Sequence, residues 1–437
     1  MTSAPSHVHL IGIGGAGVSA LARVFLARRD RVTGCDIAET VATRALAAEG
    51  AAIVLGHDPA HVLDADLVVH TSAVFGPALE EVAAARRAGA RVQTRAEVLA
   101  DLIAGTDSVA VAGSHGKTTI THMLGHVLTA AGWDPTILVG DRTHSRAGGS
   151  SWLVAEADES DGSLVLHRPA HAILTQVEFD HPAQFHDVAE IDALFRRFLA
   201  GVRGVALLCA DDARAAAMAA PGRRLTYGFH ESADYRCEAL GGGRYRIQRG
   251  GAELAADRLS VPGRHNVQNA TAALAMAVEL DLEPAFAASA LAGFEGAHRR
   301  LERKGVWRGA ALYDDYAHHP TEVAATIAAA RELPHRRLVV AFQVHHFARF
   351  AALRDDFAHS LAGADVAVVA EIFGPGEENP WRASATQLVE RAPNARFAPD
   401  LAAARRELEA EVRAGDLLLV MGAGEIWKLA DDLASEG

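Results

Sequence analysis

The sequence predicts an α/β protein with three successive domains. Three observations lead to this fold class. The chain has 437 residues, enough for two to four domains that each bury a core. Short runs rich in β-branched residues alternate with alanine-rich helical segments, as in parallel sheets with crossover helices. The pattern changes twice along the chain, so we expect domains at residues 1–105, 106–296 and 297–437.

The first domain should contain strands and helices in the βαβ order. A helix is expected at residues 17–28, between the first two strands. The strands that we expect cover residues 8–13, 31–35, 51–55 and 66–70. Each is a short apolar or β-branched run, which fits strands that are buried in a parallel sheet.

The second domain should open with a buried strand at residues 108–112, then a glycine-rich loop, then a helix at residues 118–131. Further strands are expected at residues 152–156, 172–177 and 205–209. Residues 234–259 are glycine-rich and alternate in hydropathy, which predicts a small antiparallel meander. Residues 263–280 should form a loop that enters a helix.

The third domain repeats the alternation, with amphipathic helices between its strands. Its strands are expected at residues 311–314, 337–342, 366–369 and 417–421. The carboxyl ends of the strands form the usual ligand edge of an open α/β sheet. Polar side chains just past a strand are therefore candidate site residues throughout the chain.

The composition excludes several classes of function. The formal net charge is -13, which argues against binding to nucleic acid or to an anionic membrane. No apolar run is long enough to cross a bilayer, and residues 1–9 lack the basic start of a secretory signal. Cys35, Cys209 and Cys237 have no metal-type spacing, so we interpret them as buried thiols in a reducing compartment. We therefore expect a cytoplasmic protein.

The first motif, Gly12–Gly17, has the pattern GxGxxG between a strand and a helix. Such glycines allow a tight turn and bring main-chain amides to a diphosphate at the helix N-terminus. The candidate binding residues in this loop are Gly14, Gly15, Ala16 and Gly17. Asp36 ends the next strand, where an acid can bind a ribose hydroxyl. A tightly packed turn is one alternative, and an NAD-dependent oxidoreductase is another.

The second motif is the glycine-rich loop of the second domain. Its residues are Gly113, Ser114, His115, Gly116, Lys117, Thr118 and Thr119. The loop contains Gly-Lys-Thr but has Val111 where the eight-residue phosphate-loop pattern has glycine. Lys117 can offset the charge of the β- and γ-phosphates, and the Thr118 hydroxyl can ligate Mg²⁺. The loop therefore predicts phosphate binding.

Acidic residues gather at the end of the strand at residues 152–156. The stretch Glu156–Asp161 holds four carboxylates, which repel one another unless they are solvated or neutralised by a cation. Because Mg²⁺ prefers carboxylate oxygens, we expect a metal site here, and a solvated acidic turn is the alternative. Asp180 and His181 follow a later strand and join the candidate site through their place in this order.

Three further motifs carry polar side chains. The amides of Asn266 and Asn269 can match an adenine edge, or Asn266 can cap a helix. The stretches Asp314–Glu322 and Phe342–Arg349 are rich in histidine and suit an anionic substrate. A metal site is the alternative for the paired histidines, but Pro320 follows one pair and no third ligand has a matching spacing.

Taken in order along nearly the whole chain, these motifs resemble those of the Mur ligase family. The motifs are GIGGAG, GSHGKTT, EADESD, DH, PGRHNVQN, DDYAHHPTE and the closing Met421–Gly424. The resemblance implies an N-terminal Rossmann-like domain for a UDP-sugar, a central P-loop ATPase-like domain for ATP and Mg²⁺, and a C-terminal Rossmann-like domain. It also implies a ligase in which a carboxylate attacks the γ-phosphate of ATP and an amine then displaces phosphate.

The resemblance assigns roles to single residues. Lys117, Glu156 and His181 would be catalytic. Thr118 and Glu156 would hold one Mg²⁺, and His181 a second. Besides the phosphate loop, ATP would contact Asn266, Asn269, Arg300 and Asp315. The UDP-sugar would contact Gly14, Gly15, Ala16, Gly17, Asp36, His319, His345 and Arg349.

Within the family, the chain resembles the branch that adds L-alanine to UDP-N-acetylmuramate in peptidoglycan precursor synthesis. Later ligases of the family carry a carbamoylated lysine after the Asp-His motif, and here no lysine lies between Lys117 and Lys304. A ligase that joins a preformed murein tripeptide to the same UDP-sugar is the main alternative, although Ser160 stands where that branch tends to carry tyrosine. A non-catalytic UDP-sugar-binding protein is a further alternative, which the intact Lys117 and His181 disfavour.

The chain also departs from the family pattern near the expected sugar and amino-acid sites. The departures are Gln176, Val344, His346 and Phe350. They leave the use of ATP unaffected and leave the amino-acid selectivity open. The expected partners are small-molecule substrates, and the chain is expected to act as a monomer or a homodimer.

Overall fold

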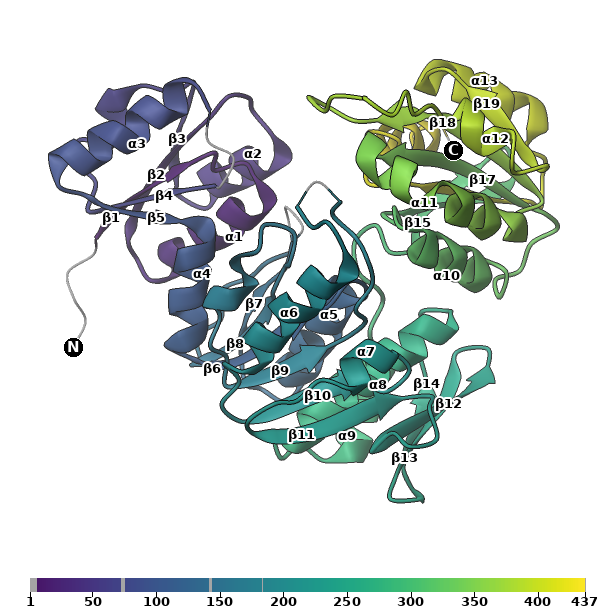
Figure 1. Ribbon diagram of the computed structural model, residues 1–437, viewed down its shortest axis with the longest axis horizontal. Coiled ribbons are helices and arrows are strands. Elements are labelled where there is room, and N and C mark those ends of the chain that lie inside the picture. Colours follow the sequence, from purple (N-terminus) through teal and green to yellow (C-terminus); the bar gives the residue numbers. More distant parts are fainter. Residues whose placement is uncertain (1–5, 72–74, 141–143, 183, 437) are drawn as a thin grey trace.

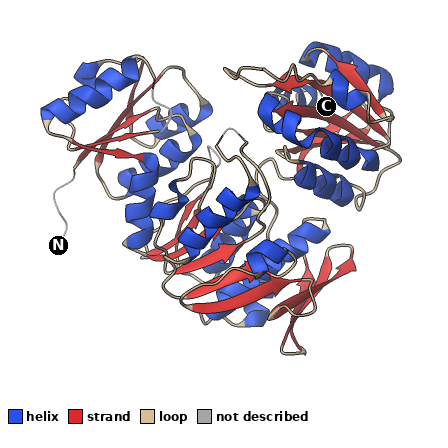
Figure 2. Cartoon of the chain, viewed as in Figure 1, coloured by secondary structure: helices blue, strands red, loops and turns tan. Residues whose placement is uncertain are grey.

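The computed structural model describes residues 6–71, 75–140, 144–182 and 184–436. It has three α/β domains, and the first and third flank the second (Figure 1). Each domain is built on one sheet with helices packed against it (Figure 2). The predicted three-domain α/β fold class is confirmed. No helix among the described residues is long and apolar enough to cross a membrane.

The N-terminal sheet is parallel, with the strand order β3-β2-β1-β4-β5. Its strands are β1 (His7–Ile11), β2 (Arg31–Asp36), β3 (Ala52–Leu55), β4 (Leu67–His70) and β5 (Arg91–Thr94). Its helices are α1 (Ala16–Ala27), α2 (Val41–Ala48), the 3-10 helix η1 (Pro59–Val62), α3 (Pro77–Ala88) and α4 (Arg95–Ala104). The strand order reverses at β1, so the glycine loop after β1 opens where ligands bind in such sheets. The sequence does not predict β5, because it has a single apolar residue and no alternation.

The central sheet has nine strands in the order β14-β13-β12-β11-β10-β9-β6-β8-β7. Its strands are β6 (Asp107–Ala112), β7 (Thr136–Leu138), β8 (Trp152–Glu156), β9 (His171–Leu174), β10 (Val205–Cys209), β11 (Arg223–Gly228), β12 (Tyr235–Gly241), β13 (Arg244–Arg249) and β14 (Ala252–Arg258). Its helices are α5 (Lys117–Ala130), η2 (Ser163–Leu166), α6 (Val188–Leu199), α7 (Ala213–Ala216), α8 (Arg264–Glu279) and α9 (Pro284–Ala292). The predicted meander is confirmed, because β12, β13 and β14 pair antiparallel.

The C-terminal sheet has the strand order β15-β16-β20-β17-β18-β19. Its strands are β15 (Glu302–Trp307), β16 (Ala310–Asp315), β17 (Leu338–His345), β18 (Val366–Phe373), β19 (Ala395–Ala398) and β20 (Leu417–Met421). Its helices are α10 (Pro320–Ala330), α11 (Phe347–Ser360), η3 (Leu361–Gly363), α12 (Thr386–Val389), α13 (Leu401–Glu411) and α14 (Trp427–Ala434). Only the edge strand β15 pairs antiparallel, so the carboxyl ends of β16 and β17 lie on the same edge.

Candidate active site

The phosphate-loop motif lies at the carboxyl edge of the central sheet. β6 precedes the loop and pairs in parallel with both β8 and β9. Val111 of β6 lies opposite Glu156 of β8, and Ala112 lies opposite Leu174 of β9. The register of the sheet therefore brings the acidic stretch after β8 and the Asp-His motif after β9 to the same edge as the loop.

Two glycines let the loop pack closely against its neighbours. Gly113 has φ +123°, and a Cβ there would collide with the side chain of Thr175. Gly116 has φ +82° and is the N-cap of α5, and a Cβ there would lie 2.7 Å from Asn269 Oδ1. The first amides of α5 therefore open toward the loop, where a helix N-terminus favours phosphate.

Lys117 is held by the buried carboxylate of Glu159, with Asp158 nearby. Its Nζ donates to Glu159 Oε2 at 2.8 Å and to the main-chain oxygen of Gly113 at 2.7 Å, and Asp158 Oδ1 is 3.6 Å away. Burial alone would lower the pKa of Lys117, but the nearby carboxylates, Glu159 above all, raise it above its ordinary value. Burial raises the pKa of Glu159 to about 7, even beside the lysine. The amine therefore stays charged and can offset the charge of a phosphate.

Two groups of side chains can hold a divalent cation. Thr118 Oγ1 donates to Glu156 Oε2 at 2.9 Å, so the pair predicted to share a metal does lie together. Asp158, Glu159 and His181 each offer a ligand atom within 4.8 Å of the others. His181 has φ +55°, and such left-handed strain in a residue other than glycine is often found at functional sites.

His115 of the phosphate loop faces the C-terminal domain. Its Nε2 is 3.3 Å from Glu178 Oε2, and its Nδ1 is 3.3 Å from Glu322 Oε1 of α10. Burial favours the neutral ring, but the two carboxylates raise the pKa of His115 to about 10. Burial would raise the pKa of Glu178, but the hydrogen bond from His115 and its charge lower that pKa to about 2. A charged imidazole thus joins the loop to α10.

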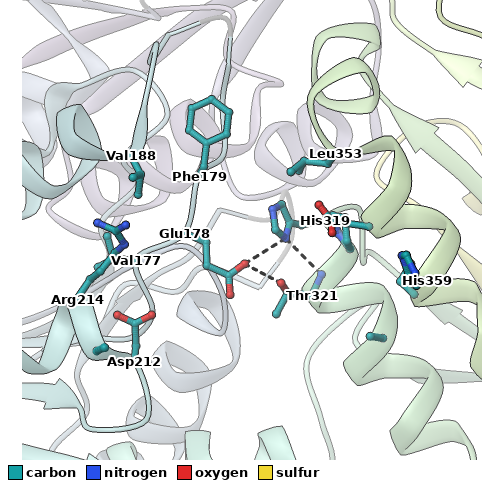
Figure 3. A pocket seen from close by; sticks show the side chains of 15 residues that line it. Val177, Glu178, Phe179, Val188, Asp212, Arg214, His319, Thr321, Leu353 and His359 are labelled. Atoms are coloured by element: carbon teal, nitrogen blue, oxygen red, sulfur yellow. Dashed lines mark hydrogen bonds and ion pairs between the residues drawn. The ribbon is translucent and has the colours of Figure 1, made fainter.

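Glu178 reaches the start of α10 directly (Figure 3). Thr321 Oγ1 donates to Glu178 Oε2 at 2.6 Å, and His319 Nδ1 is 3.5 Å from the same oxygen. These residues form part of the wall of a cavity of about 730 Å³ between the central and C-terminal domains. Phe179 and Arg214 also line this cavity, which gives it an apolar and a cationic portion.

A buried ion pair lies beside His181. Arg349 Nε donates to Asp180 Oδ1 at 2.8 Å, and the main-chain nitrogen of His181 donates to the same oxygen at 2.7 Å. Burial would raise the pKa of Asp180, but Arg349 holds it far below its ordinary value. The main-chain oxygen of His345 accepts a hydrogen bond from Arg349 Nη1 at 3.2 Å. The ring of His345 packs against the ring of His346. Burial lowers the pKa of His345 to about 3, so its ring is neutral.

Arg300 and Asp315 lie on the C-terminal side of the site. Asp315 accepts hydrogen bonds from the main-chain nitrogens of Leu301 at 2.6 Å and Ala317 at 2.7 Å, and burial raises its pKa to about 6. Arg300 Nη1 is 3.7 Å from Glu322 Oε1. Asp315 therefore orders the segment that carries Arg300, and contact of either residue with the nucleotide stays a prediction.

The two asparagines of α8 lie beside the phosphate loop. α8 begins two residues before Asn266 and has the preceding glycine at its N-cap, so the interpretation of Asn266 as a helix cap is wrong. Asn266 Nδ2 instead donates to the main-chain oxygen of Pro262 at 2.7 Å. Asn269 lies against Gly116. Contact of both amides with adenine stays a prediction.

The glycine loop of the N-terminal domain is ordered by Asp36. The amide of Gly14 donates to Asp36 Oδ2 at 2.8 Å, so this amide is engaged within the protein. Arg95 packs on Gly17 and its Nη2 lies 3.5 Å from Asp161 Oδ2 of the acidic stretch after β8. Arg95 therefore connects the first glycine loop to the edge that carries Lys117.

Three carboxylates of the site receive no role from the sequence. Glu159 and Glu322 lie inside predicted motifs and Glu178 lies just before the Asp-His motif, yet each binds a partner from another part of the chain. One signal in the sequence could have predicted these carboxylates. A buried lysine or histidine needs a counter-charge, so an acidic residue in or beside another motif is expected to pair with it.

Comparisons with known proteins give the family. Three family models match in order: "Mur ligase family, catalytic domain" over residues 7–106, "Mur ligase middle domain" over residues 111–277, and "Mur ligase, glutamate ligase domain" over residues 299–424. A curated relative from Acidothermus cellulolyticus, named UDP-N-acetylmuramate--L-alanine ligase, is 43% identical, and the match covers 95% of this chain and 91% of the relative. The chain belongs to the Mur ligase family.

Solved structures agree with this membership. The UDP-N-acetylmuramate-alanine ligase MurC of Thermotoga maritima has a TM-score of 0.81 at 27% identity, with 99% of both chains covered. The murein peptide ligase of Psychrobacter arcticus has a TM-score of 0.72 at 25% identity, again with 99% of both chains covered. The predicted family and the class of ATP-dependent ligase are confirmed.

Proposed function

We propose that this Mur ligase joins L-alanine to the lactyl carboxylate of UDP-N-acetylmuramate, with ATP converted to ADP and phosphate. The observation that carries the proposal is the 43% identity, over 95% of the chain, to a relative named for this reaction. We assign UDP-sugar binding to residues 1–105, ATP binding to residues 106–296, and closure over the site to residues 297–437.

The phosphate loop positions ATP in this proposal. The amides at the start of α5 and the charged amine of Lys117 face the β- and γ-phosphates. Glu159 holds the amine at the correct place, and the glycines keep the main chain close to the phosphate oxygens. Phosphoryl transfer depends chiefly on such positioning and charge neutralisation.

The donor set fits Mg²⁺. Glu156 and Thr118 would hold one ion, because carboxylate and hydroxyl oxygens suit a hard cation. His181 would hold a second together with Asp158 and Glu159, whose ligand atoms lie within 4.8 Å of one another. When bound, such ions neutralise charge on the phosphate oxygens during transfer. His181 is oriented by the hydrogen bond from its main chain to Asp180.

The UDP-sugar would approach from the N-terminal domain. Because the Gly14 amide is engaged by Asp36, the diphosphate would meet the first amides of α1, which begins at Ala16. The sugar carboxylate would then lie at the edge that carries Lys117, where Arg349 and His345 can orient it. The carboxylate oxygen bonds to the γ-phosphorus, ADP leaves, and the alanine nitrogen then bonds to the acyl carbon as phosphate leaves.

A tripeptide-adding ligase is the second candidate. The cavity of about 730 Å³ between Glu178 and α10 offers more room than alanine requires. The fold is also similar to the murein peptide ligase of Psychrobacter arcticus. Phosphate release from ATP in the presence of UDP-N-acetylmuramate separates the candidates. We expect release that depends on L-alanine and Mg²⁺ and is weaker with L-serine or glycine; release with the murein tripeptide alone would contradict the proposal.

The lysines offer a matched pair of variants. Lys117→Ala should reduce turnover by at least about 10³-fold, because the γ-phosphate loses a buried counter-charge, while UDP-sugar binding persists. Lys304→Ala removes a lysine paired with Asp431 on the C-terminal domain and should leave turnover within about twofold. Calorimetric titration with UDP-N-acetylmuramate measures binding. Retained turnover in Lys117→Ala would contradict the assignment of the ATP site.

The remaining parts of the proposal concern location and assembly. A reaction that consumes ATP and a UDP-sugar fits the cytoplasm, where we place the enzyme. We also propose that the enzyme acts as a monomer or a homodimer.

A further inference from the structure

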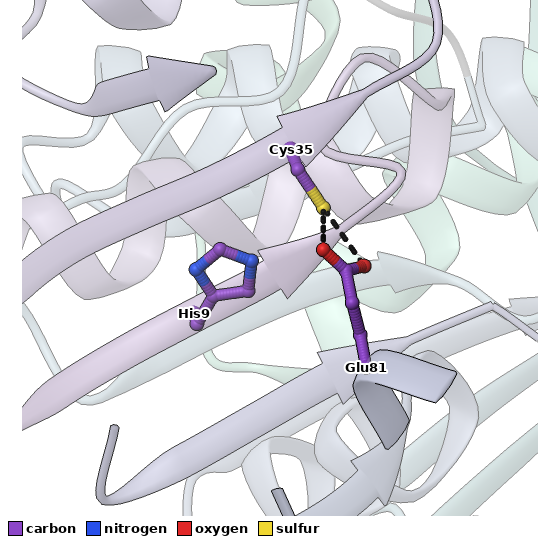
Figure 4. A group of neighbouring side chains, drawn as sticks. All are labelled: His9, Cys35 and Glu81. Carbon is purple, nitrogen blue, oxygen red and sulfur yellow. Dashed lines mark hydrogen bonds between the residues drawn. The ribbon is translucent and has the colours of Figure 1, made fainter. Parts of the chain in front are cut away.

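A second cluster of metal-ligating side chains lies within the N-terminal domain. His9 of β1 and Cys35 of β2 point to the sheet face that α3 covers, and Glu81 of α3 points back toward them (Figure 4). All three are buried, with His9 1%, Cys35 0% and Glu81 0% exposed. Their ligand atoms lie within 4.8 Å of one another. None of these residues has a role in the ligase reaction proposed above.

Two histidines from the segment after β3 reach the same carboxylate. His57 Nδ1 is 2.9 Å from Glu81 Oε2 and 3.3 Å from Cys35 Sγ, and His61 Nδ1 is 2.9 Å from Glu81 Oε1. Cys35 Sγ is 3.2 Å from Glu81 Oε2. His9 and His61 also lie with their rings stacked at 6.1 Å. Thiol, imidazole and carboxylate groups thus converge from β1, β2, α3 and the segment after β3.

The hydrogen bonds of His9 leave one ring nitrogen available. His9 Nδ1 and His7 Nε2 are each 2.8 Å from Thr33 Oγ1, and His7 Nδ1 is 2.9 Å from the main-chain oxygen of Asp64. That oxygen can only accept, so His7 donates to it from Nδ1, and the Thr33 hydroxyl lies between His7 Nε2 and His9 Nδ1. When the Thr33 hydroxyl donates to His7 Nε2, it accepts from His9 Nδ1, and a lone pair is left on His9 Nε2.

This lone pair is buried without a hydrogen-bond partner among the residues that the structure describes. Burial lowers the pKa of His9 to about 4, so the ring is neutral and the lone pair is not neutralised by a proton. Burying a hydrogen-bond acceptor without a partner costs free energy. The unpaired nitrogen therefore indicates that His9 can bind an ion together with the groups around it. The series of hydrogen bonds from Asp64 through His7 and Thr33 also fixes the orientation of the His9 ring. Metal-binding histidines are commonly oriented in this way by a hydrogen bond to the ring nitrogen that does not bind the metal.

We propose that His9, Cys35, Glu81 and His57 form a structural site for a divalent cation of the Zn²⁺ type. Zinc binds thiolate, imidazole and carboxylate in tetrahedral sites, whose ligand atoms lie about 3.3–3.6 Å apart. The three measured separations among Cys35, His57 and Glu81 are 2.9, 3.2 and 3.3 Å. His9 reaches the same group, because its ligand atom lies within 4.8 Å of those of Cys35 and Glu81.

The chemistry of the donors selects the cation. Mg²⁺ and Ca²⁺ prefer oxygen ligands, whereas a site with one sulfur and two nitrogens suits zinc and its neighbours in the first transition row. Burial and the charge of Glu81 raise the pKa of the Cys35 thiol, so without a metal the thiol keeps its proton and donates to Glu81. Metal binding replaces that proton.

The site would stabilise the first glycine loop. The main-chain oxygen of Cys35 accepts hydrogen bonds from the amides of Gly12 at 2.8 Å and Ile13 at 3.1 Å. The next residue, Asp36, holds Gly14. A metal on the Cys35 sulfur therefore fixes the end of β2 and, through it, the loop that precedes α1.

The test uses the full chain, dialysed free of metal and then titrated with Co²⁺ in excess Mg²⁺. Cobalt bound to thiolate absorbs in the near ultraviolet, and the Asp158, Glu159 and His181 group contains no sulfur, so the signal reports the new site alone. We expect one equivalent of Co²⁺ with this band, displacement by Zn²⁺, and a rise of several degrees in the unfolding midpoint on addition of Zn²⁺.

Matched cysteine variants complete the test. Cys35→Ser keeps a donor for Glu81 but removes the sulfur, and should lose the band and the thermal shift. Cys237→Ala removes another buried thiol, in the core of the central domain, and should keep both. If Cys35→Ser fails to fold, the wild-type spectrum still decides. Absence of the band in wild-type protein, or its persistence in Cys35→Ser, would overturn the proposal, and neither result depends on ligase activity.

Discussion

The central domain meets its two neighbours through opposite kinds of contact. Toward the N-terminal domain, Leu138, Leu153 and Ala155 join the apolar cluster of β1 and α1. Toward the C-terminal domain, the contacts are polar and charged, with His115 between two carboxylates and Asp180 paired with Arg349. The first interface continues a hydrophobic core and adds one partly exposed ion pair, Arg95 with Asp161, whereas the second is a set of ion pairs around the phosphate loop.

The difference concerns how each interface can move. Apolar surfaces that interlock lose packing when they separate, so the first two domains should behave as one unit. A polar interface can exchange its partners for water or for substrate charges, as domain closure requires. Because the ion pairs of the second interface include phosphate-loop and Asp-His residues, we infer that closure and assembly of the catalytic site are one event.

The largest effect is expected from breaking the buried ion pair. Arg349→Ala leaves Asp180 buried without its counter-charge, which costs about 3–5 kcal/mol in the closed arrangement. That cost corresponds to roughly a 10²–10⁴-fold loss in kcat/KM. Phosphate release measures it. Arg331→Ala, which breaks a half-exposed pair with Asp365 in the same domain, is the control and should change kcat/KM less than threefold. Equal effects of the two variants would contradict the role of the buried pair.

The apolar interface should respond in stability instead. Leu153→Ala removes a buried side chain between the first two domains and should lower the free energy of unfolding by about 3 kcal/mol. Turnover per folded molecule should change little, because the interface carries no catalytic group. Denaturant unfolding measures the stability, and Leu166→Ala, at a half-exposed leucine, is the control with a change below about 0.5 kcal/mol. If Leu153→Ala lost turnover but kept its stability, the apolar interface would have a catalytic role and not a structural one.

The two interfaces also mark how far the sequence could be interpreted. The glycine loops and Glu156 could be located from the sequence because each adjoins a strand, and His181 follows the next strand along the chain. The bond of Glu178 with Thr321 spans 143 residues, and the bond of Asp180 with Arg349 spans 169 residues. No local pattern encodes such pairs, since only the relative placement of two domains brings them together.

The cysteine interpretation shows the same limit. Cys35 has no metal-type spacing in the sequence, because Glu81 lies 46 residues away and His9 lies on the neighbouring strand. The pleat of the sheet puts His9 and Cys35 on one face, and α3 supplies the carboxylate. A metal site is easiest to predict from sequence when its ligands lie close together in one loop. Here His9 and Cys35 lie on one face of the sheet and Glu81 comes from α3, so no sequence spacing reveals the site.

A smaller effect is expected from a single neutral donor at the polar interface. Thr321→Val removes the hydroxyl that donates to Glu178 at 2.6 Å and should cost about 1.5 kcal/mol, roughly a tenfold shift toward the open arrangement. Energy transfer between one dye on each domain measures the shift. Thr129→Val is the control, because the Thr129 hydroxyl donates to Gly125 and accepts from Arg146, both of the central domain. An unchanged distribution in Thr321→Val would show that this bond does not hold the interface closed.

Near neutral pH the effect of a change in pH is the smallest, and it has a definite sign. His115 has its pKa raised to about 10 in the closed arrangement, so its contribution is complete below pH 6.5 and is lost as pH rises toward 10. Glu178 has its pKa lowered to about 2, so its contribution is complete above pH 4.5 and is lost as pH falls toward 2. The same dye pair should therefore report most closure between pH 4.5 and 6.5.

Glu322→Gln separates this pH dependence from a general alkaline expansion. The variant removes one of the two carboxylates that raise the pKa of His115, so its opening should begin at lower pH than in the wild type. Beside Arg95 at the apolar interface, burial lowers the pKa of His167 to about 4, so this ring stays neutral as pH rises. A dye pair across the first two domains should therefore report no change at alkaline pH. Equal pH dependence at the two interfaces would show that the charged contacts around His115 do not control closure.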